Sequence, residues 1–168
     1  LVAHRARDGD RLADRARVVG LRLRVAELRA PEPERRFEIG AEGVRVFQQR
    51  YPATGAANAE VRLAILSLET GEAAWADLGQ QDYYLARVAW FPEGTRLLVQ
   101  RQSRDQKRLD VLSYAVTGGE ARELFSERSD TWVELHDDLY FLPERREILW
   151  ASQRSGHNHL YLYDYGGM

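Results

Sequence analysis

The sequence contains no cysteine, which excludes disulfide bonds, thiolate metal sites and a cysteine nucleophile. No stretch approaches the roughly 20 consecutive apolar residues that a membrane-spanning helix needs. Acidic and basic residues nearly balance, at a net charge of -2, so there is no excess of positive charge to attract nucleic acid or anionic lipid. We therefore expect neither nucleic acid nor a membrane among the partners of this protein.

Aromatic residues are missing from positions 1–34, and every basic residue in that stretch is an arginine. From Phe37 onward the character changes, because aromatic residues become frequent and short apolar runs alternate with Gly, Pro, Asp and Asn. That alternation is typical of strands and turns. The chain is thus divided into an atypical arginine-rich segment at 1–34, interpreted as frame-shifted or poorly ordered, and a strand-rich domain at 35–168.

Eight strands are predicted in the second part, and several of them are joined by short turns. The turns Pro92-Glu93-Gly94 and Pro143-Glu144-Arg145 each connect a strand ending in aromatic residues to one rich in aliphatic residues, as in β-hairpins. The predicted strands span residues 44–51, 61–68, 85–91, 96–102, 109–116, 138–142, 147–152 and 159–163.

A repeat of blade length runs through these strands. At an offset of 51 residues the following pairs match: Trp90 with Phe141, Pro92 with Pro143, Leu97 with Ile148, Leu98 with Leu149, Leu109 with Leu160 and Val111 with Leu162. A partial third copy, at nearly the same offset, places Val61 against Leu109 and Gly71 against Gly119. The unit of about 50 residues has the length of a four-stranded propeller blade.

A single twisted sheet cannot bury both of its apolar faces, whereas sheets stacked around an axis bury the faces of one another. The repeat therefore predicts an all-β fold, a partial β-propeller of about two to three four-stranded antiparallel blades. An immunoglobulin-like sandwich also has short strands, but it does not require a constant repeat offset.

Four segments in order resemble the propeller of the dipeptidyl peptidase IV family, whose members are serine peptidases of the prolyl oligopeptidase type. The residues from Tyr51 to Asn58 resemble its Tyr-Pro-x-x-Gly-x-x-Asn turn. The segments that follow, from Val61 to Lys107, resemble consecutive blade segments of the bacterial members, and Ser152–Gly156 with His159–Asp164 resembles the next Arg-x-Gly turn and His-Leu-Tyr strand. The resemblance covers about residues 35–167.

The resemblance implies an eight-bladed propeller above an α/β-hydrolase domain, in an exopeptidase that releases Xaa-Pro or Xaa-Ala dipeptides. A glutamate pair that binds the substrate amino terminus, and a Trp-Trp hairpin after it, are expected near residues 3–22, where the sequence instead has Arg17-Val18-Val19-Gly20. Codons for those four residues can contain TGGTGG, which reads Trp-Trp in another frame. Either residues before about Arg35 are translated in a shifted frame, or the first segment has diverged and is inactive.

No serine stands in the Gly-x-Ser-x-Gly motif that forms the nucleophile elbow of an α/β-hydrolase. The serines are at positions 67, 103, 113, 126, 129, 152 and 155. We therefore expect no catalytic residues and no cofactor in this chain, which would gate and orient peptide substrate in a parent enzyme. The parent would be periplasmic or secreted and a homodimer, by resemblance. The alternative is a stand-alone propeller-like binding module for peptide or glycan.

The connection from Trp132 to Asp137 is the best candidate for a functional site, because it gathers Trp, His and acidic residues outside a strand. It resembles the family segment that approaches the substrate cavity, and Trp132, His136 and Asp137 are the predicted substrate-binding residues. The alternative interpretation is that Trp132 packs between blades while His136 and Asp137 cap a turn. His136, His157 and His159 do not have a spacing that fixes a third zinc ligand, so no metal site is predicted.

Overall fold

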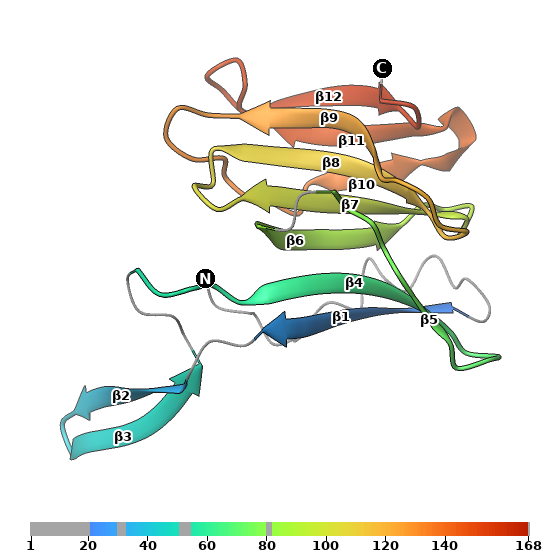
Figure 1. Ribbon diagram of the computed structural model, residues 1–168. Coiled ribbons are helices and arrows are strands. Elements are labelled where there is room, and N and C mark those ends of the chain that lie inside the picture. The colour runs from blue at the N-terminus through green and yellow to red at the C-terminus, as the bar shows by residue number, and fades with distance from the viewer. Residues whose placement is uncertain (1–20, 30–32, 51–54, 80–81, 168) are drawn as a thin grey trace.

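The computed structural model describes residues 21–29, 33–50, 55–79 and 82–167, and almost all of its regular structure is β-strand (Figure 1). One short 3-10 turn, η1 (Pro143–Arg145), interrupts the strands. The strands are β1 (Leu21–Arg29), β2 (Pro33–Gly40), β3 (Gly43–Arg50), β4 (Glu60–Ser67), β5 (Ala73–Trp75), β6 (Tyr83–Trp90), β7 (Arg96–Ser103), β8 (Arg108–Ala115), β9 (Arg122–Arg128), β10 (Leu139–Leu142), β11 (Glu147–Ser152) and β12 (His159–Asp164). Among the described residues no helix is long and apolar enough to cross a membrane.

The strands form four antiparallel sheets. One sheet has four strands in the order β6-β7-β8-β9, two have three strands in the orders β1-β4-β5 and β10-β11-β12, and the hairpin β2-β3 forms the fourth. The prediction of an all-β partial propeller is confirmed. All eight predicted strands are present within two residues of their expected ends, and β1, β2, β5 and β9 were not predicted.

The four-stranded sheet lies between the two three-stranded sheets and buries both of its faces (Figure 1). Side chains alternate along a strand, so neighbouring residues of β7 face opposite ways. Leu98 packs with Trp150 and the rest of one core cluster, next to β10-β11-β12. Leu97 and Val99 pack with Leu63 in the other cluster, next to β4. This mutual burial of stacked sheets is the reason that one blade needs neighbours.

The repeat holds through the first two strands of successive blades and shifts in the third. Trp90 pairs with Leu97, and Phe141 pairs with Ile148, so the first pairing keeps the offset seen in the sequence. In the next pairing, Arg96 lies opposite Ala115. Glu147, the residue that corresponds to Arg96, lies opposite Asp164, which is two positions before the one that the offset would give. The matching of Leu109 with Leu160 was therefore wrong by two residues in register. A shift of two leaves every side chain on its original face, so the apolar pattern remained in phase.

Strand β1 lies inside the arginine-rich segment 1–34. It pairs with β4 from Leu21 opposite Ser67 to Arg29 opposite Glu60, with an irregularity in register between Glu27 and Arg29. Residues 21–29 are therefore an integral strand of a blade sheet. Residues 1–20, in which the glutamate pair was expected, lie outside the described residues.

The hairpin β2-β3 projects away from the stacked sheets in Figure 1. Its large apolar side chains are exposed, and the exposure of Ile39 reaches 81%. The others are Phe37, Val44, Val46 and Phe47. The first half of the resembled Tyr-Pro turn, residues 51–54, follows the hairpin and lies outside the described residues.

Candidate substrate-binding loop

The connection between β9 and β10, residues 129–138, is held by hydrogen bonds along its length. The Val133 N–H donates to the carbonyl of Gln106 at 2.7 Å, and Nε2 of Gln102 donates to the carbonyl of Val133 at 3.1 Å. Further along, the Asp138 N–H donates to Nδ1 of His136 at 3.2 Å. The backbone is thus anchored to the hairpin β7-β8 in the middle of the loop, which fixes the side chains that flank Val133.

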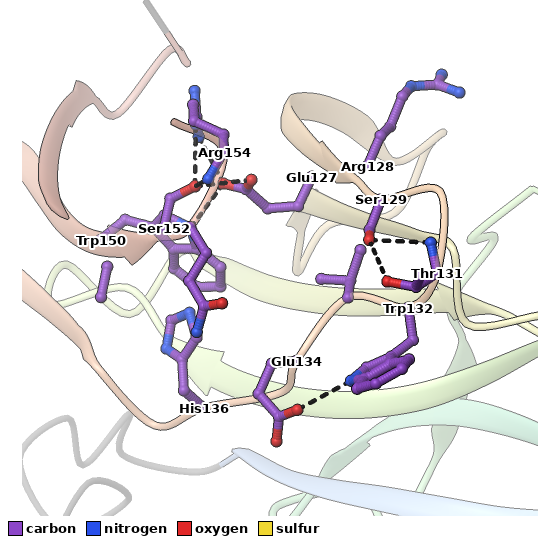
Figure 2. Close-up of a pocket in the computed structure, with 13 residues that line it drawn as sticks. Glu127, Arg128, Ser129, Thr131, Trp132, Glu134, His136, Trp150, Ser152 and Arg154 are labelled. Carbon is purple, nitrogen blue, oxygen red and sulfur yellow. Dashed lines mark hydrogen bonds and ion pairs between the residues drawn. The ribbon is translucent and has the colours of Figure 1, made fainter. Parts of the chain in front are cut away.

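A cavity of about 300 Å³ lies between this loop and β11 (Figure 2). Its lining combines aromatic, acidic and hydroxyl side chains. They come from the end of β9, from the loop and from β11 with the turn after it: Glu127, Arg128, Ser129, Thr131, Trp132, Val133, Glu134, His136, Trp150, Ala151, Ser152, Gln153 and Arg154.

Glu127 is the buried acidic residue of this cavity. Its Oε1 accepts a hydrogen bond from Nε1 of Trp150 at 2.9 Å and forms an ion pair with Arg154. Its Oε2 accepts a hydrogen bond from the hydroxyl of Ser152 at 2.8 Å. Burying a carboxylate is unfavourable unless its oxygens are paired and hydrogen-bonded, and here three donors meet that need. The cluster joins β9 of one sheet to β11 of the next.

Arg154 extends the cluster toward solvent. Its Nε donates to the Ser152 hydroxyl at 3.0 Å, and its guanidinium lies 4.5 Å from the ring centroid of Tyr161, in cation–π geometry. Burial by itself lowers the pKa of the Arg154 guanidinium, but the hydrogen bond to Glu127 and the further electrostatic interactions with Glu127 and Tyr163 together outweigh it, so that the pKa lies above its usual range. Arg154 is therefore a permanent cation at the cavity wall.

The structure brings two of the three predicted site residues into this cavity. The ring of His136 lies 4.6 Å from the ring of Trp150, centroid to centroid. Trp132 is 60% exposed, and its Nε1 donates to Glu134 at 3.1 Å, as the dashed line in Figure 2 marks. Trp132 therefore does not pack between blades, which was the alternative interpretation of this residue.

Asp137 does not line the same cavity. Its Oδ1 forms an ion pair with Nε of Arg87, on β6, at 2.8 Å, and the side chains of Arg87 and Asp137 are 44% and 73% exposed. Arg87 and Asp137 line a second cavity, between β6 and β10. His136 lines this cavity as well as that of Trp132. The loop thus presents two faces, with His136 between them.

The arrangement is suited to binding. An exposed indole, the carboxylate of Glu134 and the imidazole of His136 offer stacking and hydrogen bonds to a peptide. Within the described ranges no three His, Cys, Asp or Glu side chains are grouped so that they could hold a metal ion. The rings of His157 and His159 lie 6.4 Å apart, where the turn after β11 leads into β12.

Sequence reasoning missed Glu127 as the centre of this cluster. The sequence associates Ser152 and Arg154 with an Arg-x-Gly turn, but nothing in it links that turn to a glutamate 27 residues earlier than Arg154. Only the packing of one sheet on the next brings them together.

The stacked antiparallel sheets, each sharing its faces with its neighbours, define part of a β-propeller. The sequence profile of the family described as "Dipeptidyl peptidase IV (DPP IV) N-terminal region" matches residues 23–167. The chain belongs to this family, and the resemblance seen in the sequence is confirmed. The match begins within the arginine-rich segment, close to the start of β1.

Two solved structures place this region in a larger molecule. A protein assigned as a dipeptidyl aminopeptidase IV, from Bacteroides ovatus, matches with a TM-score of 0.71 and 27% identity over 88% of this chain. The dipeptidyl peptidase 4 of Porphyromonas gingivalis matches with a TM-score of 0.76 and 19% identity over 89% of this chain, a likeness of fold. The present chain spans 21% and 22% of those two chains.

Proposed function

We propose that this chain is the substrate-gating propeller region of a dipeptidyl peptidase IV-like serine exopeptidase, which releases Xaa-Pro or Xaa-Ala dipeptides from the amino terminus of peptides. Catalysis would reside in a hydrolase domain of the parent enzyme, and Trp132, His136 and Asp137 would contact the substrate. The observation that carries the proposal is the placement of Trp132 and His136, together with the anchored Glu127 cluster, around one cavity in a propeller of this family.

The loop combines a backbone that is fixed by hydrogen bonds with side chains that are exposed to solvent. The hydrogen bonds to Gln102 and Gln106 fix the middle of the loop, while Trp132 and Glu134 remain open to solvent. Binding residues are most effective when a rigid scaffold holds them, because little conformational freedom is then lost on binding. A peptide chain can stack on the indole and donate its N–H groups to the carboxylate.

The test is the replacement His136→Ala in the full-length enzyme, with His157→Ala as a matched control. His157 is an exposed histidine that lines neither cavity of the loop. We expect His136→Ala to raise KM for an Xaa-Pro anilide about fivefold or more, the loss of at least one hydrogen bond or ring contact, with kcat largely kept. An unchanged KM for His136→Ala would remove this residue from the substrate site.

The alternative function is a stand-alone module that binds peptide or glycan. A stable monomer with a sharp unfolding transition would support it. The exposure of Leu160 and Leu162 on β12, at the edge of its sheet, instead favours a larger propeller in which further structure covers these side chains.

We further propose that the parent enzyme is a homodimer and is periplasmic or secreted, both on the strength of the family resemblance. The exposed apolar hairpin β2-β3 supports a protein contact at that place, since isolated hairpins with apolar surface are seldom left open to water. Ile39→Glu in the parent should then shift the sedimentation coefficient from dimer to monomer. A dimer that persists would exclude the hairpin as the contact.

The arginine-rich start of the chain is proposed to result from a shifted reading frame. The in-frame match from residue 23 requires the shift to lie upstream of about that position, earlier than the boundary at Arg35. Sequencing the genomic locus tests this directly. A restored frame should encode Glu-Glu and Trp-Trp, and their absence from every frame would favour a diverged segment.

A further inference from the structure

A second and larger cavity, of about 890 Å³, lies between β6 and β10. It is distinct from the cavity of Trp132, although His136 lines both. Most of its walls are apolar, and they come from neighbouring sheets: Val88, Ala89 and Trp90 on β6, Leu98 on β7, and Leu139 and Phe141 on β10. A volume and lining of this kind are typical of sites for an apolar ligand with few polar groups.

Gln100, on β7, is the buried polar residue of this cavity. It is only 4% exposed, and its Oε1 has no hydrogen-bond partner within the described part of the chain. A buried acceptor without a partner is unfavourable, and such groups in folded proteins usually meet a donor from water or a ligand. Because Oε1 of Gln100 lies beside apolar walls, it is suited to a ligand in which an N–H donor stands next to an apolar group.

Two of the charged groups at the cavity neutralise each other. Arg87 and Asp137, which both line it, pair with each other at 2.8 Å. The cavity therefore offers no unpaired charge from this pair to an ionic ligand, and an uncharged one is favoured. Asp138, which also lines the cavity, is exposed to water. The apolar walls therefore favour an uncharged ligand, and a free carboxylate is disfavoured.

We propose that this cavity binds an uncharged apolar residue within a peptide, with its side chain among Ala89, Leu98 and Phe141 and an adjacent amide N–H donating to Oε1 of Gln100. The proposal deepens the proposed peptide-binding function, on which it rests, by naming a second contact for a residue of the peptide other than its charged terminus. Gln100 is then a specificity residue that selects an N–H donor beside an apolar group.

The test is a calorimetric titration of this chain with N-acetyl-phenylalanine amide, which has an apolar ring, amide N–H groups and no charge. Saturable one-to-one binding is expected. Gln100→Leu should weaken it about fivefold, which corresponds to ~1 kcal/mol for one neutral hydrogen bond. Because that replacement also removes a buried unpaired acceptor, it should not lower the melting temperature of the free protein.

Two further variants make the result specific. Gln48→Leu is the same chemical change at an exposed position on β3 that lines neither cavity, so it should bind like the wild type. Ala89→Leu narrows the second cavity and should abolish binding while its melting transition stays cooperative. Absence of binding to the wild type, or equal affinities of Gln100→Leu and Gln48→Leu, would overturn the proposal.

Failure of this inference and failure of the proposed function give different results. If the amide does not bind but His136→Ala still raises KM in the parent enzyme, the second cavity is not a peptide site and the proposed function stands. If the amide binds as described but no peptidase activity accompanies the parent protein, the cavity is a peptide site of a binding module and the proposed function fails.

Discussion

The indole N–H of Trp150, on β11, donates a 2.9 Å hydrogen bond to Glu127, on β9 of the neighbouring sheet. Trp150 is almost completely buried, and the ring of Phe125, two residues before Glu127, packs edge-on against it at 5.4 Å. One pair of strands therefore carries both an apolar and a polar contact between successive blades. The polar contact fixes the position of one sheet relative to the next.

Replacing Glu127 by Ala should destabilise the chain by about 3–5 kcal/mol, since it leaves the donors of Trp150 and Arg154 without their acceptor. Glu127→Gln should have a smaller effect, because its amide keeps an acceptor oxygen. Urea unfolding measures both.

The control is Glu123→Ala, on the same strand. Glu123 is exposed and pairs with Arg108, so its loss should change stability by less than about 1 kcal/mol. Similar losses for Glu123→Ala and Glu127→Ala would contradict the assigned role of Glu127.

Gly167 should not tolerate a side chain. Its φ is +90°, and a Cβ there would lie 2.3 Å from the carbonyl oxygen of Leu124. Gly119 has a φ of +106° with nothing within 4 Å of the same position, so Gly119→Ala measures the backbone strain alone, about 1–2 kcal/mol. Gly167→Ala should lose about 1–3 kcal/mol more through steric overlap. Equal melting temperatures for the two variants would refute this.

Much of the fold could be predicted from the sequence because its strands are apolar and bounded by turn residues. The strands that were not predicted have a weaker signal. In β9 the charges of Arg122, Glu123, Glu127 and Arg128 surround a short apolar centre, and β5 has three residues. In β1, Leu21, Leu23 and Val25 do alternate with arginines, a period-two pattern that indicates a strand, but the arginine bias of the segment outweighed it in the prediction.

The candidate site was only partly accessible from sequence. The composition of the loop pointed to Trp132 and His136, which do line one cavity. The role of Glu127 depends on the packing of one sheet against another. The role of Gln100 depends on a cavity between β6 and β10, two strands that lie far apart in the sequence. Such relationships are set by tertiary packing and leave no local pattern.

Stability should fall at high pH through the buried tyrosines. Burial raises the pKa of Tyr165 above its usual value, and the same cause raises those of Tyr83 and Tyr163. A raised folded pKa means that the stabilisation is complete below the unfolded value of about 10 and is lost as the pH rises through the folded value.

Tyr165→Phe should reduce this alkaline loss without lowering stability at pH 7, because the Tyr165 hydroxyl is buried with no partner in the described part of the chain. Tyr140→Phe, at an exposed position, is the control and should leave the pH profile unchanged. Melting temperatures from pH 8 to 11 measure the difference. Identical profiles for Tyr165→Phe and the wild type would show that this tyrosine does not contribute.

The ion pair of Arg87 and Asp137 should contribute little to stability despite its 2.8 Å separation, because neither side chain is buried and water screens the pair. A double-mutant cycle with Arg87→Ala and Asp137→Ala should give a coupling below about 1 kcal/mol. A coupling well above that limit would indicate that the pair is desolvated in the assembled molecule, where further structure covers the loop.

The most direct test of the whole account is to express the complete reading frame that contains these codons and to assay release of dipeptides from a Gly-Pro-initiated peptide by mass spectrometry. The account predicts that Gly-Pro is released from the free peptide, while the same peptide with an acetylated amino terminus is left intact. Absence of cleavage, in a folded product that binds peptide, would contradict the peptidase assignment and identify the propeller as a binding module.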